Sequence, residues 1–219
     1  MVRAVLLMPE EKAALARDFA RSSGIALIST TVDSLEKLKS AFSEPCDLLM
    51  SFNTGVIVPE HILQLPGLIA LNIHAASPDF PGRDPHHFAL YHGVKKYGAT
   101  IHYMTGKVDQ GHIINMKLFD VPERISAAEL LAKADKVGIE LMRQFFNAYA
   151  VSGAPEPKSG IFWGSQKSTR NDFIELCRID CTMPESEFLR RLESTAMPGF
   201  NNLYIDIHGY RFRLQGKVK

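Results

Sequence analysis

The fold is decided by residues 47–74, which have the sequence DLLMSFNTGVIVPEHILQLPGLIALNIH. Residues 47–52 and 68–74 are short, nearly continuous apolar runs, as expected for strands that are buried on both faces of a parallel sheet. Between them, Pro59 opens a short segment with helical spacing, residues 59–65. A strand, a helix and a second strand in this order predict the βαβ unit of an α/β fold.

The segments on either side of this unit repeat the same alternation. Strands are predicted at residues 2–8, 25–29, 99–104 and 112–121, and helices at residues 10–22, 34–42 and 86–92. Ser126 and Glu129 have the spacing of a capping box, which predicts a long helix that ends near residue 149. We therefore expect an α/β protein with a Rossmann-like, mostly parallel sheet whose strands end at one shared edge.

The last third of the chain has a different pattern. Residues 152–168 contain three glycines and two prolines, which is typical of a linker or flap. Beyond them, residues 182–194 predict a short helix and residues 203–214 predict a hairpin. We expect a core in residues 1–150, followed in residues 151–219 by the linker and a small C-terminal subdomain made of a helix and a hairpin.

Composition limits the class of protein. Of 219 residues, 46% are hydrophobic and 22% are charged, which is ordinary for a globular chain that can bury a sizeable core. The 25 basic and 24 acidic residues give a net charge of +1, which disfavours nucleic acids and membrane surfaces as partners. Three cysteines without zinc-site spacing indicate reduced thiols. No apolar run has the length of a signal peptide or a membrane span, so we expect a soluble, cytoplasmic protein.

The strand at residues 68–74 ends in two polar side chains. Asn72 and His74 are two residues apart, so they project from the same face at the carboxyl edge, where open α/β sheets bind ligands. The alternative is a strand end whose polar groups are satisfied by neighbouring backbone. A third candidate is Asp109, in the loop at residues 107–111, although this loop by itself favours an ordinary turn that ends in Gly111.

Several common kinds of site are disfavoured. Histidines lie close together in the sequence, among them those at positions 74, 86, 87, 102 and 112. None has the His-Glu-x-x-His spacing and no cysteine lies among them, so we expect no metal. The chain also lacks the G-x-G-x-x-G fingerprint of nicotinamide-binding folds and the G-x-S-x-G elbow of α/β-hydrolases.

Four motifs occur in a fixed order. They are Asn72-Ile73-His74, then Pro78-x-Phe80-x-Gly82-x-x-Pro85, then Gly98-Ala99-Thr100-Ile101-His102, and then Asp109-x-Gly111-x-Ile113. Together they resemble the folate-dependent formyltransferase family, and the resemblance extends from about residue 1 to residue 150. It implies the formyltransferase fold and an enzyme that uses 10-formyltetrahydrofolate as its cosubstrate.

The resemblance also implies roles for three residues. Formyl transfer to an amine passes through a tetrahedral intermediate with a negatively charged oxygen, and the amide of Asn72 would donate a hydrogen bond to it. His74 would supply a second donor or carry the proton lost by the amine. Asp109 would orient His74 and favour its protonated form.

The folate is expected to lie against two loops, held largely by main-chain groups. The positions that the resemblance assigns to it are Phe52, Asn53, Gly55, Ile57, Val108 and Gly111. For Phe52 and Ile57, packing in the core is an equally good interpretation.

The acceptor is expected to be a small-molecule amine. Relatives formylate glycinamide ribonucleotide, methionyl-tRNA or nucleotide-linked amino sugars. Met8-Pro9-Glu10-Glu11 replaces the glycine- and serine-rich phosphate loop of the first group, and the chain ends soon after the hairpin, unlike the second. We therefore favour a nucleotide-linked amino sugar.

The expected acceptor positions are Arg83, His86, Trp163 and Arg170. Trp163 or Phe162 would stack on a nucleobase and Arg170 would meet a diphosphate. The ordinary alternatives are an apolar anchor for the linker and a surface charge. A homodimer fits this interpretation, and a catalytically silent folate or nucleotide binder remains the alternative from another class.

Overall fold

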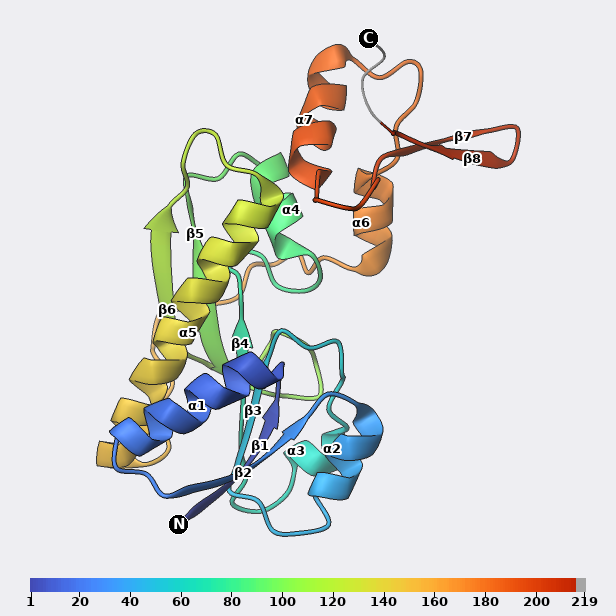
Figure 1. Cartoon of the computed structure of the whole chain (residues 1–219). Coiled ribbons are helices and arrows are strands. Elements are labelled where there is room, and N and C mark those ends of the chain that lie inside the picture. Colours follow the sequence, from blue (N-terminus) through green and yellow to red (C-terminus); the bar gives the residue numbers. More distant parts are fainter. Residues whose placement is uncertain (216–219) are drawn as a thin grey trace.

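A six-stranded sheet forms the centre of the computed structural model, which describes residues 1–215 (Figure 1). In spatial order, its strands are β2 (Leu27–Val32), β1 (Val2–Leu7), β3 (Leu48–Phe52), β4 (Ile69–His74), β5 (Lys96–Tyr103) and β6 (Ile113–Asp120). The first four are parallel, whereas β5 is antiparallel to both β4 and β6. The expected mostly parallel α/β sheet is confirmed. The chain changes direction across the sheet between β1 and β3, and their carboxyl ends form the edge at which open sheets bind ligands.

Helices cover both faces of this sheet. They are α1 (Glu10–Ser22) and α5 (Ala127–Ser152) on one face, and α2 (Leu35–Ala41) and α3 (Glu60–Leu63) on the other (Figure 1). Because side chains alternate along a strand, Leu6 and Met50 pack toward α1 and α5, whereas Val5 and Leu49 pack toward α2 and α3. Two apolar cores therefore hold the sheet rigid from both sides.

The long helix begins where the sequence predicted. The side chain of Ser126 accepts from the backbone of Glu129, and the side chain of Glu129 accepts from the backbone of Ser126, which completes the capping box. Leu130, Ala134 and Leu141 are buried against the sheet, as the expected apolar stripe requires. The helix continues to Ser152, three residues further than expected.

Two strands differ from the sequence prediction in their bounds. β2 covers Leu27–Val32 rather than residues 25–29, because Thr30 and Thr31 pair with β1 although they are not apolar. β5 starts at Lys96 rather than at residue 99, because its register against β6 extends to Lys96 and Asp120. In both cases pairing with a neighbouring strand, and not the apolar pattern, sets the length.

The tail returns to the core before it forms its own elements. Residues 153–169 contain no helix or strand, and we call residues 161–169 the strap. The tail elements are α6 (Arg170–Leu176), α7 (Glu185–Thr195), β7 (Tyr204–Ile207) and β8 (Tyr210–Arg213). The helix α7 and the hairpin were expected, but α6 was not, although Thr169 and Asp172 form a second capping box. Residues 216–219 lie outside the described part of the chain.

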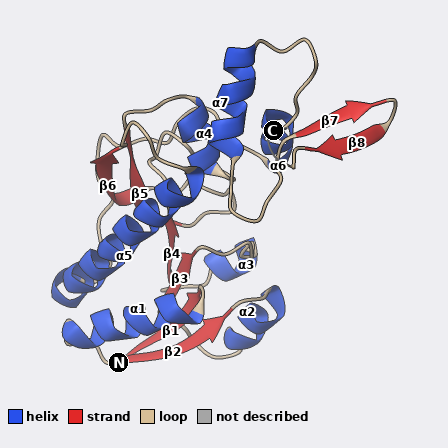
Figure 2. Ribbon diagram, turned by 45° about the horizontal axis from the view of Figure 1, so that its top comes forward, coloured by secondary structure: helices blue, strands red, loops and turns tan. Residues whose placement is uncertain are grey.

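The tail packs on α4 (Pro85–Tyr91), while the hairpin projects away from the body of the molecule (Figure 2). The hydroxyl group of Tyr91 donates to Glu187 on α7 at 2.8 Å. Nδ1 of His87 donates to the carbonyl oxygen of Ser194, at the end of α7, at 2.7 Å. Among residues 1–215, no helix is both long and apolar enough to cross a membrane.

Candidate active site

The end of β4 carries the two side chains that the sequence singled out. Asn72 and His74 lie on one face of this strand, at the carboxyl edge of the sheet. β5 runs antiparallel beside β4 and places His102 opposite Asn72. Nδ2 of Asn72 lies 3.1 Å from Nε2 of His102. The register of the two strands thus adds a histidine that sequence reasoning did not include among the catalytic residues.

Asp109 reaches the same place from the loop between β5 and β6. Its Oδ2 lies 3.6 Å from Nδ1 of His74, and its Oδ1 lies 3.4 Å from Nε2 of His102. The backbone N–H of Gly82 donates to Oδ2 at 2.8 Å. Asp109 is only 3% exposed and has a φ of 50°, in the left-handed region that aspartate tolerates better than most residues. We call Asn72, His74, His102 and Asp109 the polar cluster.

Backbone carbonyl groups determine where both imidazoles carry a proton. Nε2 of His74 lies 2.8 Å from the carbonyl oxygen of Phe80, and Nδ1 of His102 lies 2.8 Å from that of the next residue. A carbonyl oxygen can only accept, so these nitrogens donate. The other nitrogen of His102 accepts from Asn72, and Nδ1 of His74 faces the carboxylate of Asp109. His74 can therefore gain a proton where a carboxylate would stabilise the cation.

Burial and charge act in opposite directions on this histidine. Burial lowers the pKa of His74 below its ordinary value, and the charge of Asp109 offsets this only in part. Burial would raise the pKa of Asp109, but His74, His102 and the N–H of Gly82 together hold that pKa at about 2. At neutral pH a neutral imidazole thus lies beside an ionised carboxylate. Asp109 favours the protonated form of His74, as expected, but burial outweighs the carboxylate and the net pKa is lowered.

Trp163 of the strap covers the polar cluster. Its Nε1 donates to the carbonyl oxygen of Gly111 at 2.8 Å. The centroid of its ring lies 5.8 Å from that of His74 and 4.8 Å from that of His102, with the rings edge-on in both cases. A side chain from the tail therefore forms one wall of a cluster that otherwise belongs to the core.

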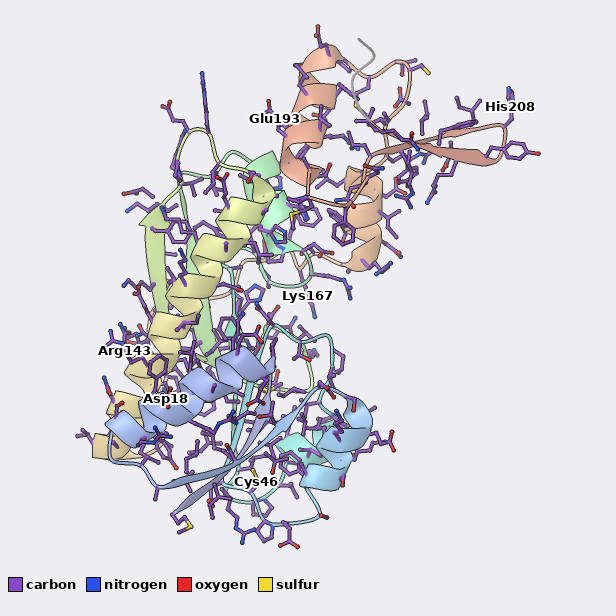
Figure 3. The ribbon with its side chains drawn as sticks, viewed as in Figure 1. Asp18, Cys46, Arg143, Lys167, Glu193 and His208 are labelled. Carbon is purple, nitrogen blue, oxygen red and sulfur yellow. The ribbon has the colours of Figure 1, made fainter. Side chains whose placement is uncertain are left out.

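Three neighbouring hollows lead outward from the polar cluster, and each shares lining residues with the next. An inner hollow of about 100 Å³ is bounded by the loop after β3, by the end of β4 and by the loop that carries Asp109. A middle hollow of about 300 Å³ shares Asp109 with it and is also lined by Trp163. An outer hollow of about 950 Å³ shares Pro81 and Lys167 with the middle one, and Lys167 is labelled in Figure 3. The outer hollow is thus the largest of these three but does not touch the polar cluster, and it adjoins the middle hollow, which does.

The positions expected to contact the folate fall into two groups. Ile57 and Val108 are exposed and line the inner hollow. Asn53 and Gly55 lie in the loop after β3, exposed but outside the hollow's lining, and Gly111 is buried beside the strap. The side chain of Phe52 is fully buried in the core, in line with the packing interpretation, so only its backbone could approach a ligand.

The positions expected to contact the acceptor are also divided. Trp163 lines the middle hollow. Arg83 is exposed, with its Nε 3.5 Å from Oδ2 of Asp84, and Arg170 is the exposed first residue of α6. Neither arginine lines the outer hollow, whose cations are Lys167, Arg178 and Arg191. Sequence reasoning missed these three because the packing of the tail, and not a local motif, brings them together.

The histidines that are close in sequence separate in the structure. His74 and His102 join the polar cluster, whereas His86 lies in α4, only 6% exposed, with its ring 4.1 Å from that of His87. Neither ring nitrogen of His86 has a hydrogen-bond partner among residues 1–215, and burial lowers its pKa to about 3. His86 does not line any of the three hollows. Within the described part of the chain, no group of three or more His, Cys, Asp or Glu residues could hold a metal ion.

Comparison with protein families gives one match that covers more than half of the chain. Residues 26–145 match the family model described as formyl transferase. Methionyl-tRNA formyltransferase from Listeria welshimeri is 30% identical over 153 residues, which cover 68% of this chain and 47% of that protein. The chain thus spans about half the length of this curated relative.

Solved structures resemble the whole chain. A 4-N formyltransferase from Francisella tularensis matches with a TM-score of 0.78 and 19% identity, over 99% of this chain and 97% of that one. An N-formyltransferase from Helicobacter canadensis, determined with folinic acid and dTDP-3-aminofucose, matches with a TM-score of 0.69 and 14% identity, over 95% and 85%. At these identities the likeness shows a shared fold.

Proposed function

This chain belongs to the formyl transferase family, and we propose that it transfers a formyl group from 10-formyltetrahydrofolate to the primary amine of a nucleotide-linked amino sugar. The observation that carries this proposal is the polar cluster. It combines an amide donor, a neutral imidazole and an ionised carboxylate at the carboxyl edge of the sheet.

In the proposed reaction, the amine attacks the formyl carbon and a tetrahedral intermediate forms. One N–H of Asn72 bonds to His102, and the other is available to the oxyanion. Neutral His74 accepts the proton that the amine loses, and the carboxylate of Asp109 stabilises the resulting cation. The bond from the formyl carbon to N10 then breaks, and the proton passes from His74 to that nitrogen. Tetrahydrofolate leaves and the formamide product remains.

The inner hollow is the proposed place for the reacting end of the folate. Ile57 and Val108 supply exposed apolar surface beside the polar cluster, as a flat aromatic ring system requires. Asn53, Gly55, Gly111 and the backbone of Phe52 would complete the two loops around it. The relative from Helicobacter canadensis was determined with folinic acid, which supports a folate ligand for the family fold.

The outer hollow is the proposed place for the body of the acceptor. Its volume of about 950 Å³ is within the range of sites for large ligands. Three cations, Lys167, Arg178 and Arg191, line it together with four carboxylates, and we propose that these cations bind a diphosphate. We propose that Arg83 and Arg170 lie at its rim and that Trp163 borders the path to the polar cluster. In this arrangement residues 1–150 form the catalytic core, and residues 151–219 complete acceptor binding.

A second acceptor, methionyl-tRNA, is favoured by one observation. The sequence relative from Listeria welshimeri is a methionyl-tRNA formyltransferase. The net charge of +1 supports the sugar acceptor instead, because a polyanionic tRNA is usually held by an excess of basic residues.

The two acceptors can be separated directly. The protein is incubated with 10-formyltetrahydrofolate and, in parallel, with nucleotide-linked amino sugars, glycinamide ribonucleotide and methionyl-tRNA, and products are identified by mass. We expect formylation of a sugar nucleotide, and its loss in His74→Asn. If only methionyl-tRNA is formylated, methionyl-tRNA replaces the sugar nucleotide as the proposed acceptor. If no acceptor reacts but 5-formyltetrahydrofolate still raises the melting temperature by binding the folded state, the protein is a silent folate binder.

A further inference from the structure

The strap is held against the loop before α4 by backbone hydrogen bonds. The N–H of Gly164 donates to the carbonyl oxygen of Pro78 at 2.9 Å, and the N–H of Ser168 donates to that of Pro81 at 3.0 Å. The N–H of Arg83 returns a bond to Ser168 at 2.9 Å. The strap thus follows the loop like an added strand, although it belongs to the tail.

The two segments approach closely because a glycine stands at each contact. A Cβ atom on Gly82 would lie 2.2 Å from the carbonyl oxygen of Ser168, and one on Gly164 would lie 2.4 Å from that of Asp79. Gly82 also has a φ of 99°, which side-chain-bearing residues rarely adopt. The same Gly82 donates its N–H to Asp109, so the anchor of the strap and the polar cluster share a residue.

Trp163 extends from this anchored strap to both histidines of the polar cluster. Its N–H is already used by Gly111, in the segment that follows Asp109. Its ring lies edge-on to His74 and to His102. His74 is therefore enclosed by the end of β4, by the carbonyl oxygen of Phe80, by Asp109 and by an indole that comes from beyond the core.

From this geometry we infer that Trp163 is a positioning residue of the catalytic centre, and that its primary role is not to stack on a nucleobase. It holds the rings of His74 and His102 against Asp109 and closes them from bulk water. This inference rests on the proposed function for the meaning of "catalytic", but the closure itself is a property of the protein without substrate.

The closure has a chemical consequence. The titratable groups that face His74 are Asp109, whose charge favours the imidazolium, and His102, whose protonation would oppose it. With Trp163 in place, burial decides the balance and the imidazole stays neutral. Without the indole, water would reach both rings, and the pKa of His74 would rise toward its ordinary value of 6.5. The rings would also be free to turn, and misplacing a catalytic group by about 1 Å can cost about a hundredfold in rate.

The closure can be tested with diethyl pyrocarbonate, which acylates neutral imidazoles that solvent reaches. The modification rate of each histidine is read by peptide mass spectrometry in wild type, Trp163→Leu, Trp163→Phe and Tyr210→Leu. His208, exposed at the tip of the hairpin, is the internal standard (Figure 3). His86 and His87 are buried in α4 and report on general unfolding. Tyr210→Leu removes an exposed tail aromatic and is the matched control.

In Trp163→Leu, we expect His74 and His102 to be modified severalfold faster while His86 and His87 stay protected. The pH midpoint for modification of His74 should rise toward 6.5, and Trp163→Phe should give an intermediate result. Tyr210→Leu should match wild type. Unchanged rates at His74 and His102 would overturn the inference, and so would faster modification that includes His86 and His87.

A binding measurement separates this inference from the proposed function. Trp163→Leu should bind 5-formyltetrahydrofolate as wild type does, because Trp163 does not line the inner hollow. If wild type itself binds no folate, the proposed function fails while the closure test stands. If Trp163→Leu loses affinity for the acceptor with no change at the histidines, the indole is a substrate contact and the inference is rejected.

Discussion

Two pairs of buried histidines occur among residues 1–215, and only one of them lies beside a carboxylate. His74 and His102 lie at the end of the sheet, with a carboxylate 3.6 Å and 3.4 Å from their rings. His86 and His87 lie in α4, beneath the tail, with their ring centroids 4.1 Å apart. Burial lowers the pKa of His74, of His86 and of His87, so burial does not distinguish the pairs.

The partners of each pair make the difference. Three nitrogens of His74 and His102 have protein partners, and the fourth, Nδ1 of His74, faces Asp109. His87 has one carbonyl partner and stacks on Phe173, whereas both nitrogens of His86 lack one within residues 1–215. A buried histidine becomes chemically useful when a carboxylate can stabilise its cation and a hollow gives a ligand access to it. The charge of Asp84 raises the pKa of His87 only in part, and no carboxylate of residues 1–215 lies within 4.0 Å of a ring nitrogen of either histidine in α4. Neither histidine lines one of the three hollows.

Of the substitutions that test this contrast, removal of the Asp109 carboxylate should have the largest effect on the rate. We expect Asp109→Asn to lower the rate of formyl transfer by about a thousandfold, within the range for disabling general acid–base catalysis. Since Asp109 raises the pKa of His74, its loss should move the acidic limb of the pH–rate profile to lower pH. Asn can keep the left-handed turn and accept from Gly82, so the fold is preserved.

The control for this substitution is Asp120→Asn, which removes an exposed carboxylate at the end of β6. It should leave both the rate and the pH profile unchanged. If Asp109→Asn has the same rate and pH–rate profile as wild type, Asp109 is only a turn residue, and the carboxylate does not distinguish the two pairs of histidines.

Removing the amide donor should have a smaller effect. We expect Asn72→Ala to reduce kcat by about a hundredfold, or about 3 kcal/mol, as loss of one oxyanion donor does in acyl-transfer enzymes. Affinity for 5-formyltetrahydrofolate should be largely retained. Asn147→Ala, which removes an exposed amide on α5 bonded to Ser23, is the control. A loss of folding in Asn72→Ala, without a specific loss of rate, would favour the ordinary strand-end interpretation.

The pair in α4 should control acid stability. The native pKa of His86 is about 3, below its ordinary 6.5, so the unfolded state takes up a proton first as pH falls. The protein should therefore lose stability between pH 6.5 and pH 3. At pH 5 the loss amounts to about 2 kcal/mol, as a proton-uptake calculation gives for such a shift.

His86→Leu should remove most of this loss, and urea unfolding at pH 7 and pH 5 would measure it. His208→Leu, at the exposed tip of the hairpin, should leave the pH dependence unchanged. If His86→Leu is as acid-sensitive as wild type, another group controls unfolding. The KM of the same variant for the acceptor tests the expectation that His86 contacts substrate.

Much of the fold can be predicted from local sequence patterns, because apolar runs and helix caps determine many of its strands and helices. The apolar runs of β1 and β3 and the capping box at Ser126 all appear where predicted. The bounds of β2 do not, since pairing with β1 recruits Thr30 and Thr31. The helix α6 has only seven residues, which is too few for a periodic apolar pattern to predict it, and its capping box is the one local signal for it.

Some residues of the candidate site also follow from local spacing, whereas others depend on tertiary packing. Period-two spacing places Asn72 and His74 side by side, but only the register of β5 against β4 brings in His102. Lys167 and Trp163 reach the site through packing of the tail, which no local spacing encodes. The protonation of His74 could not be predicted from its neighbours in sequence, because burial by distant segments outweighs the charge of Asp109.

The position of Trp163 also has a spectroscopic consequence. It is the one tryptophan among 219 residues, so all indole emission of this protein originates at the polar cluster. Imidazolium groups quench indole emission on contact, and an aromatic ligand in the adjoining hollows would absorb or transfer that light. The protein therefore carries an intrinsic optical reporter, and titrating unlabelled wild type with acid or with ligand would show events at the site without background from elsewhere in the chain.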